Sequence, residues 1–353
     1  TLSLHDALPI CHMERYCTKI LCSPGKEDGV LWVVEATGLT PDTDYYYRAG
    51  TFKGFDEATG EFSAPDLSPV YHFKSGLPKG DATPFVIGFG SDSQNWFPTF
   101  GDDLKIIRQT YGNQARFWLY GGDLTETYTE QDMSNWFDVM QPFNHYFVGM
   151  PVQGNHGLFA GESFGRFTWP MMGEPLPPGD QKHAWSFSFG NAHIIGMDST
   201  GEAIVGRDAA WLESDLAAAR ADKDITWIVV MYHIPPYSSS TSHGSTEYLQ
   251  RLWVPLFDKY NVDLSLSGHD HDYERTKPLK GGVVVPEGQG TVYIVSGGFY
   301  AQKSYGNGTS DFTAVSFDGP CKSHLMLSFS GNTLTGQAYK GNHEPLDTFT
   351  LTK

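Results

Sequence analysis

Short apolar runs alternate with amphipathic segments along the chain from residue 85 onward. The apolar runs have the length and the β-branched and aromatic content of buried strands. They include FVIGFG at 85–90, ARFWLY at 115–120, ITWIVV at 225–230 and VDLSLS at 262–267. The intervening segments carry apolar residues every three or four positions, as helices packed on a sheet do. This alternation predicts an α/β architecture.

Helices are expected at residues 102–111, 130–140, 207–222 and 245–260. In the segment 207–222, Trp211, Leu212 and Leu216 recur at helical spacing, and we expect them to point at a sheet while charged neighbours face water.

The rest of the pattern divides the chain into segments of different character. Residues 1–17 are treated as unreliable or foreign to the fold, and no signal peptide is visible in them because no basic segment precedes an apolar one. Residues 18–76 read as strands separated by turns, which indicates an all-β domain. Residues 77–84, LPKGDATP, are expected to be a linker. The α/β domain is expected at 85–318, completed by C-terminal strands at 319–353.

The net charge and the length of the apolar runs argue against nucleic-acid binding and against a membrane span. The 353 residues include 24 basic and 41 acidic ones, a net charge of −17. Such an acidic chain repels polyanions, so no nucleic-acid partner is expected. No apolar run reaches the length of about 18 residues that a membrane helix needs, so no membrane span is expected.

Five short polar motifs follow the apolar runs: GSDSQ, GGDLTE, GNH, MYH and GHDH. Their chemistry-bearing residues are Asp92, Gln94, Asp123, Glu126, Asn155, His156, His233, His269 and His271. In an α/β sheet the carboxyl ends of strands share one edge, so these side chains are expected to converge there. Carboxylate, amide and imidazole ligands suit borderline first-row metals, and the set contains no cysteine.

Together the motifs, with GHDHDYERT at the last of them, resemble the calcineurin-like metallophosphoesterases and, within them, purple acid phosphatases. The phrase GLTPDTDYYYRAG resembles a fibronectin type III domain. The resemblance implies a four-layer α/β/β/α metallophosphoesterase sandwich, preceded by a partial, all-β fibronectin type III-like domain. It also implies a secreted or periplasmic protein.

The same resemblance implies a binuclear metal centre, with two ions per chain that are iron, zinc or manganese. Asp92 and His271 are expected to bind the first ion, and Asp123 to bridge both. The expected ligands of the second ion are Asn155, His233 and His269.

The implied function is hydrolysis of small phosphate monoesters, as in acid phosphatases, by direct attack of a metal-bound hydroxide. His156 and His243 are the implied catalytic groups outside the metal shell, because they can donate hydrogen bonds to phosphoryl oxygens and protonate the leaving group. A phosphodiesterase or nucleotide hydrolase using the same metals remains an alternative. A remoter one is a non-catalytic β-sandwich binding protein with a vestigial phosphatase fold. The oligomeric state is not readable from the sequence.

Two positions depart from the patterns of related phosphoesterases. Glu126 stands where that family has a tyrosine three residues after the bridging aspartate, and Tyr128 lies too far along the chain to replace it. We therefore expect a colourless or weakly coloured protein in which Glu126 orients His156 instead of binding metal. Gln94 occupies the place of a histidine ligand in other relatives, and is expected to complete the first metal's shell or to hydrogen-bond next to it.

Overall fold

The computed structural model describes residues 19–22, 30–33, 38–51, 54–56, 58–59, 61–63, 66–94, 100–159, 184–299, 305–306, 308–317 and 322–353. The chain divides into two compact units, Thr1–Gly76 and Leu77–Lys353.

The described part of the first unit consists of antiparallel strand pairs. The pairs are β1 (Lys19–Cys22) with β2 (Val30–Val33), β3 (Asp44–Tyr47) with β8 (Tyr71–Lys74), β4 (Gly50–Thr51) with β7 (Asp66–Leu67), and β5 (Gly54–Asp56) with β6 (Glu61–Ser63). Across β3 and β8, Tyr45 stacks on Phe73 with ring centroids 5.8 Å apart. The likeness to a fibronectin type III domain stays a prediction, and the expectation for residues 1–17 lies outside the described residues.

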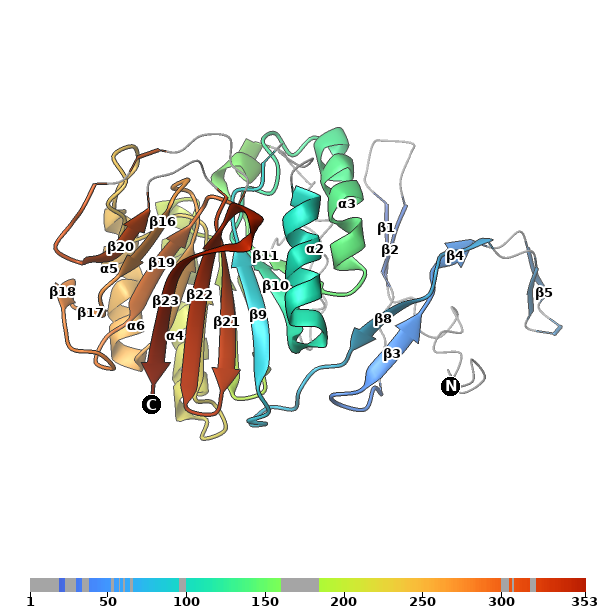
Figure 1. The fold of residues 1–353 in the computed structure, drawn as a ribbon, viewed down its shortest axis with the longest axis horizontal. Coiled ribbons are helices and arrows are strands. Elements are labelled where there is room, and N and C mark those ends of the chain that lie inside the picture. Colours follow the sequence, from blue (N-terminus) through green and yellow to red (C-terminus); the bar gives the residue numbers. More distant parts are fainter. Residues whose placement is uncertain are drawn as a thin grey trace. The chain divides into compact units, whose positions relative to one another are not determined.

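The second unit contains two large sheets that face each other (Figure 1). In the first sheet, six described strands run in the order β11-β10-β9-β21-β22-β23. Their bounds are β9 Phe85–Gly90, β10 Ala115–Tyr120, β11 Val148–Pro151, β21 His324–Ser330, β22 Thr333–Lys340 and β23 Glu344–Thr352. Strands β9 to β11 are parallel, and β21 pairs antiparallel with β9. The C-terminal strands therefore extend this sheet.

In the second sheet, seven described strands run in the order β12-β13-β14-β15-β19-β16-β20. Their bounds are β12 Ala184–Phe189, β13 Ala192–Met197, β14 Trp227–Met231, β15 Leu264–Ser267, β16 Tyr273–Thr276, β19 Val292–Ser296 and β20 Thr313–Phe317. The central strands β13, β14, β15 and β19 are parallel. A small hairpin of β17 (Leu279–Lys280) and β18 (Val283–Val284) lies beside the sheet.

Helices cover the outer faces of both sheets (Figure 1). Their bounds are α2 Phe100–Tyr111, α3 Glu130–Asn144, α4 Glu202–Ala221, α5 Glu247–Leu252 and α6 Val254–Tyr260, with 3-10 turns η2 Gly112–Gln114, η3 Asn155–Phe159 and η5 Gly341–His343. Helices α2 and α3 lie over the first sheet, and α4 to α6 over the second. The expected α/β/β/α sandwich is confirmed.

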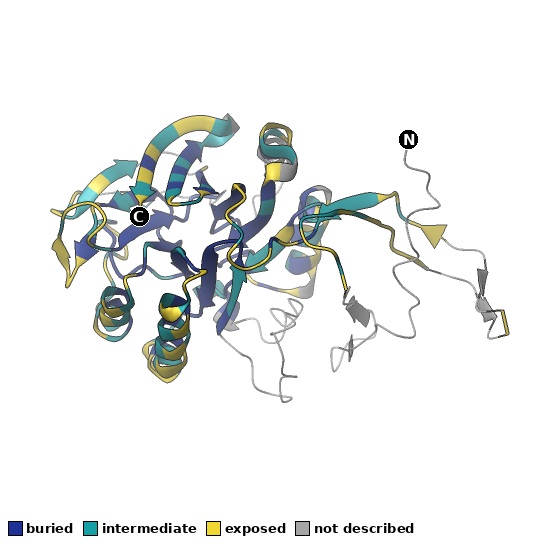
Figure 2. Cartoon of the chain, turned by 90° about the horizontal axis from the view of Figure 1, so that it is seen from below, coloured by how far each residue is buried: buried dark blue, intermediate teal, exposed yellow. Residues whose placement is uncertain are grey.

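The described apolar residues form three buried clusters that match these layers, as the dark strands of Figure 2 show. One lies between the sheets and contains Phe89 and Ile194. The second joins the first sheet to α3 through Trp118 and Trp136. The third packs helices on the second sheet. Because each fully buried large side chain contributes about 1.5–3 kcal/mol, the layers form a stable base for the loops at their ends.

One helix differs from its predicted pattern. Helix α4 starts at Glu202, earlier than expected, and its buried side chains are Val205, Leu212, Leu216 and Ala219. The expectation for Trp211 was wrong, because its side chain is 38% exposed. Successive helical residues are 100° apart, so Trp211 lies a quarter-turn from the buried stripe that Leu212 occupies.

The predicted helix 245–260 is divided into α5 and α6. Trp253 ends the first helix, and Pro255 lies in the first turn of the second. A proline removes a backbone donor and clashes with the carbonyl four residues earlier, so it is tolerated in a first turn and not in a helix interior.

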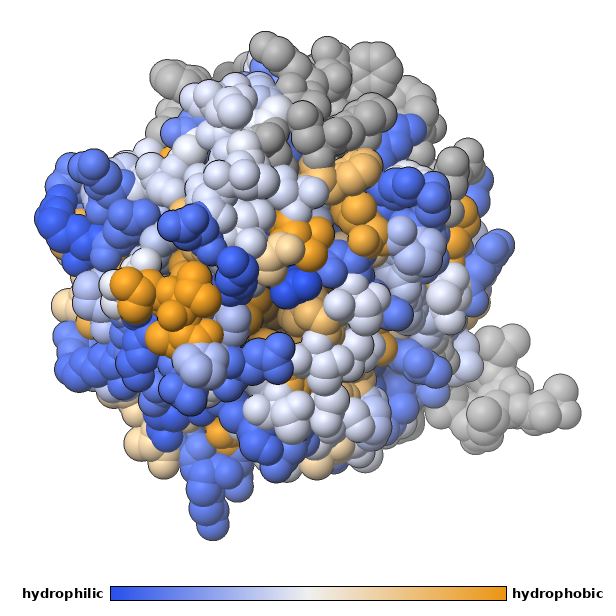
Figure 3. Space-filling model, turned by 60° about the vertical axis from the view of Figure 1, so that its left-hand side comes forward, coloured by the Kyte–Doolittle hydropathy of each residue, from blue (hydrophilic) through white to orange (hydrophobic). Residues whose placement is uncertain are grey.

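The surface shown in Figure 3 is mostly polar, in keeping with the acidic composition. Hydrophobic side chains gather over the β17–β18 hairpin, where Val283 and Val284 are 62% and 46% exposed. Among the helices that the structure describes, none has the length and apolar character needed to cross a membrane.

Candidate metal centre

The six predicted ligands follow strand ends in both sheets. Asp92, Asp123 and Asn155 come after β9, β10 and β11 of the first sheet. His233 and His269 come after β14 and β15 of the second, and His271 is two residues further on. All five strands are parallel members of their sheets, so their carboxyl ends lie at one end of the sandwich.

Three of these side chains meet at the centre of the cluster. One ligand atom from each of Asp92, Asp123 and His233 lies within 4.8 Å of the others. His233 Nε2 is 3.1 Å from Asp123 Oδ2 and 2.9 Å from Asn155 Oδ1. Its other nitrogen, Nδ1, is 2.9 Å from the backbone oxygen of Gly121, which fixes the ring so that Nε2 points inward.

The two remaining histidines join the cluster through Asp92. His271 Nε2 lies 3.5 Å from Asp92 Oδ1. The backbone N–H of His269 donates to Asp92 Oδ2 at 2.9 Å, and the His269 ring lies 5.2 Å from the His233 ring. The fold thus brings all six predicted ligand residues together.

Burial makes this cluster suited to cations. Asp92 and His233 are fully buried and Asp123 is 1% exposed. No described residue hydrogen-bonds Asp92 Oδ1, although Oδ2 is engaged. A buried carboxylate oxygen without a partner is costly unless a cation pairs with it. Together with an amide and imidazoles, the two carboxylates form a donor set that fits first-row metal ions.

The charges packed together in the cluster shift the pKa values of His233 and Asp123. Burial alone would lower the pKa of His233, but the negative charges of Asp123 and Asp92 raise it to about 9. Burial alone would raise the pKa of Asp123, but His233 and His156 hold it below its ordinary value. Metal binding requires neutral imidazole, so a cation would take the place of the His233 proton.

His269 has the opposite shift. Burial, reinforced by the neighbouring His233 and His243, lowers its pKa to about 4. Its imidazole is therefore neutral near pH 7, the form that binds metal.

The backbone of the site is unusual. Asp92, Asp123 and His269 have φ angles of 63°, 46° and 69°, in the left-handed region. Each such residue costs of order 1–3 kcal/mol, and these costs persist where the surrounding fold compensates for them, commonly at functional sites. Each of these residues lies two or three positions after the end of its strand.

Glycines in the motifs make room for the carboxylates. A Cβ at Gly154, just before Asn155, would lie 2.0 Å from Asp123 Oδ1. A Cβ at Gly268 would lie 1.9 Å from Ser91 Oγ and 2.4 Å from Asp92 Oδ2. Both positions need glycine because of close approach.

His156 lies at the rim of the cluster, beside Asp123 and Glu126. Its backbone N–H donates to Asp123 Oδ1 at 3.0 Å, and its ring Nε2 is 3.8 Å from Asp123 Oδ2. Its ring Nδ1 lies 2.9 Å from the backbone oxygen of Glu126 and 3.6 Å from Oε1 of that residue. Glu126 therefore lies beside His156, where it can orient the ring.

Tyr128 and Gln94 both hydrogen-bond the backbone of the turn that carries Asp123. Tyr128 is fully buried, and its hydroxyl accepts a hydrogen bond from the backbone N–H of Leu124 at 2.8 Å. Burial and the charges of Asp123 and Asp92 raise its pKa well above the ordinary value, so it stays a neutral phenol. The backbone N–H of Gln94 donates to the backbone oxygen of Asp123 at 3.1 Å. The role of the Gln94 side chain stays a prediction.

His243 lies next to the predicted ligands, together with two residues that sequence reasoning missed. Its ring stacks on His269 at 4.1 Å, and its Nδ1 is 2.9 Å from Oδ1 of Asp270. Tyr305 stacks on His271 at 4.3 Å. The position of Asp270 between two predicted ligands was an available signal, whereas Tyr305 follows no strand or motif.

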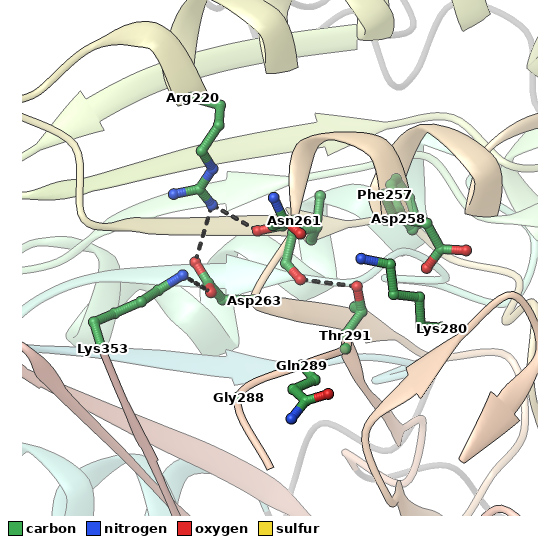
Figure 4. A pocket seen from close by; sticks show the side chains of 12 residues that line it. Arg220, Phe257, Asp258, Asn261, Asp263, Lys280, Gly288, Gln289, Thr291 and Lys353 are labelled. Carbon is green, nitrogen blue, oxygen red and sulfur yellow. Dashed lines mark hydrogen bonds and ion pairs between the residues drawn. The ribbon is translucent and has the colours of Figure 1, made fainter. Parts of the chain in front are cut away.

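A cavity of about 230 Å³ lies elsewhere, where the chain enters β15 and β19 (Figure 4). It is thus at the amino ends of these parallel strands, opposite the metal-ligand cluster. Two of its cations are engaged within the protein: Arg220 binds the backbone oxygen of Asn261 at 2.6 Å, and both Arg220 and Lys353 pair with Asp263. The pair of Lys353 with Asp263 joins residue 353 to the segment that leads into β15.

Known proteins are similar to this chain in sequence and fold. The Calcineurin-like phosphoesterase family model matches residues 85–273. Acid phosphatase type 7 from Homo sapiens is 36% identical over 266 residues, which cover 68% of this chain and 56% of that protein. Purple acid phosphatase 23 from Arabidopsis thaliana is 28% identical over 301 residues, covering 76% and 62% respectively. The structure of purple acid phosphatase PPD1 from yellow lupin (Lupinus luteus) seeds is similar with a TM-score of 0.73 at 19% identity, covering 89% of this chain and 60% of that one.

The chain belongs to the calcineurin-like phosphoesterase family. Its relatives include acid phosphatases and purple acid phosphatases, so the resemblance inferred from the motifs is confirmed. The chain spans 56% of the length of the human relative and 62% of that of the Arabidopsis relative.

Proposed function

We propose that this protein is a binuclear metal-dependent phosphoesterase that hydrolyses small phosphate monoesters. The observation that carries the proposal is the convergence of buried Asp92, Asp123 and His233 within 4.8 Å, with an oxygen of Asp92 lacking a hydrogen-bond partner among the described residues. Family membership supports the assignment as a phosphoric ester hydrolase.

The residues divide into two roles in this proposal. Asp92 and His271 would hold one ion, Asn155, His233 and His269 would hold the other, and Asp123 would be shared by both. When bound, the two ions supply an activated water and neutralise charge on the phosphoryl oxygens. His156 and His243, at the rim, hydrogen-bond the phosphoryl and leaving-group oxygens.

The direct test is hydrolysis of 4-nitrophenyl phosphate by the purified chain, with zinc, manganese or iron added and after chelation. We expect metal-dependent turnover. Inertness of a preparation shown to contain bound metal would overturn the proposal.

A phosphodiesterase or nucleotide hydrolase is the second candidate. Tyr305 favours it, because a partly exposed aromatic ring beside the cluster can contact a base or an aryl group. The metal ligands are the same for both reactions, so relative rates on 4-nitrophenyl phosphate and bis(4-nitrophenyl) phosphate distinguish them. We expect the monoester to react faster.

Location outside the cytoplasm, secreted or periplasmic, completes the proposal. It is supported by the relationship to purple acid phosphatases. Fractionation of cells expressing the complete natural gene product tests it.

A further inference from the structure

Asp270 lies between two predicted metal ligands in the sequence. Its described side-chain hydrogen bonds nevertheless go to His243 and Ser238 and not to a predicted ligand. The side chain is 0% exposed. Its Oδ1 is 2.9 Å from His243 Nδ1, and its Oδ2 accepts a hydrogen bond from Ser238 Oγ at 2.6 Å. Each carboxylate oxygen therefore has a partner.

The serine-rich loop that carries His243 holds this carboxylate in place. Ser238 Oγ, which donates to Asp270, also accepts from the backbone N–H of Ser240 at 3.1 Å. Ser245 Oγ accepts from the backbone N–H of Ser238 at 3.1 Å and is 3.1 Å from the Ser238 backbone oxygen. The serines thus form a network that fixes the loop around Asp270.

The imidazole of His243 is held on three sides. Asp270 engages Nδ1, the His269 ring covers one face at 4.1 Å, and Tyr305 packs against it at 4.9 Å with an interplanar angle of 78°. The His243 side chain is still 37% exposed. No described residue hydrogen-bonds Nε2, so this nitrogen remains for a substrate.

The loop of Tyr305 is joined to the loop of His243. The backbone N–H of Thr241 donates to Gly306 O at 3.0 Å, and its hydroxyl donates to Tyr305 O at 2.9 Å. The backbone N–H of Gly308 donates to Ser239 O at 2.9 Å. The two walls around His243 are therefore held together independently of a metal.

We propose that Asp270 is a positioning residue that acts through His243, holding the ring so that Nε2 faces the leaving-group oxygen of the phosphate ester. This inference rests on the proposed function. As the bond from phosphorus to the leaving oxygen breaks, that oxygen keeps the electron pair and takes the Nε2 proton, while water supplies the new oxygen on phosphorus. The proton that this water releases restores His243.

A double-mutant cycle tests whether Asp270 acts through His243. We expect Asp270→Asn to lower kcat by about 10- to 100-fold with bound metal unchanged by elemental analysis. In a His243→Ala background, the same change is expected to alter kcat less than about twofold. Loss of metal, or an undiminished effect in that background, would overturn the proposal.

Substrate choice gives a readout that general damage to the fold does not produce. Asp270→Asn is expected to slow an alkyl phosphate more than 4-nitrophenyl phosphate, because only the poor leaving group needs a proton. Asp270→Glu is expected to restore part of the rate. Equal losses on both substrates would count against the role.

The matched control is Asp215→Asn, which removes a carboxylate from another histidine pair. Asp215 Oδ2 lies 2.9 Å from His193 Nε2, between α4 and β13 and away from the metal ligands. We expect its kinetics to be unchanged.

A crystal structure of Asp270→Ala, which removes both carboxylate oxygens, separates this inference from the proposed function. If the wild type hydrolyses no phosphate ester, the proposed function fails, and the ring orientation of His243 still decides the positioning claim. We expect the ring to turn, and an unmoved ring would contradict it.

Discussion

At the scale of single residues, the site combines strained backbone with buried charge. Three predicted ligands have left-handed backbone, and Asp92 keeps a buried oxygen without a hydrogen-bond partner among the described residues. Both features oppose folding of the metal-free chain. They are explained if cations stabilise the native state.

Asp92→Asn tests this balance between stability and function. Removing a buried charge is expected to leave the metal-free protein as stable as the wild type, or more so. Metal at a hundredfold excess over its Kd is expected to stabilise the wild type by about 2.7 kcal/mol, which raises Tm by several degrees. The variant should gain less, as thermal unfolding with and without zinc will show. A variant that responds to zinc as fully as the wild type would exclude Asp92 as a ligand.

Gly154→Ala tests the close approach of the GNH turn to Asp123. The added Cβ would lie 2.0 Å from the carboxylate oxygen and must displace it. We expect at least a tenfold loss of metal affinity, measured by calorimetric titration. Gly201→Ala is the matched control, because nothing lies within 4 Å of its added Cβ. Equal affinities for both variants would show that the turn is more tolerant than its geometry suggests.

The sequence alone identified those residues of the site whose chemistry is distinctive. Carboxylates, imidazoles and glycines in the motifs were recognisable as ligands and turns. The position of Asp270 between two predicted ligands is visible in the sequence, but its pairing with His243 is not, because the two residues are 27 positions apart in the chain. Tyr305 left no pattern at all, since loop-to-loop contacts have no sequence period.

At the scale of elements, buried strands were readable from their apolar runs, and errors occurred where tertiary contacts decide the outcome. Trp211 is hydrophobic and was expected to face the sheet, but helix geometry turns it outward. Pro255 divides a segment whose apolar pattern is continuous. Such boundaries depend on local backbone chemistry more than on the apolar pattern.

Strand β21 carries a buried histidine that makes stability depend on pH. Burial and the neighbouring His343 lower the pKa of His324 to about 3, against an ordinary value of 6.5. As the pH falls, His324 therefore binds a proton at a higher pH in the unfolded chain than in the folded protein. As the pH falls from 6.5 to about 3, His324 is expected to lower the free energy of unfolding by about 1.4 kcal/mol for each pH unit.

His324→Phe keeps a ring and removes the titration. Urea unfolding at pH 7, 5 and 4 should show a smaller loss of stability for the variant than for the wild type. Parallel pH dependences of the two proteins would contradict the assigned pKa.

At the scale of the whole molecule, the two sheets assemble the centre. The first supplies Asp92, Asp123 and Asn155 and the second supplies the histidines, so the site exists only when both sheets are packed on their shared core. The order of motifs predicted the shared edge. How the sheets meet came from the family resemblance and not from the apolar pattern, which shows where strands are and not which strands face one another.

The most direct measurement is elemental analysis of the purified full chain after equilibration with zinc, iron or manganese. Six ligand residues around two carboxylates predict close to two bound ions per chain, and Asp123→Asn is expected to reduce that number sharply. Fewer than one ion per chain in the wild type would contradict the binuclear centre and favour a non-catalytic protein that keeps only the scaffold.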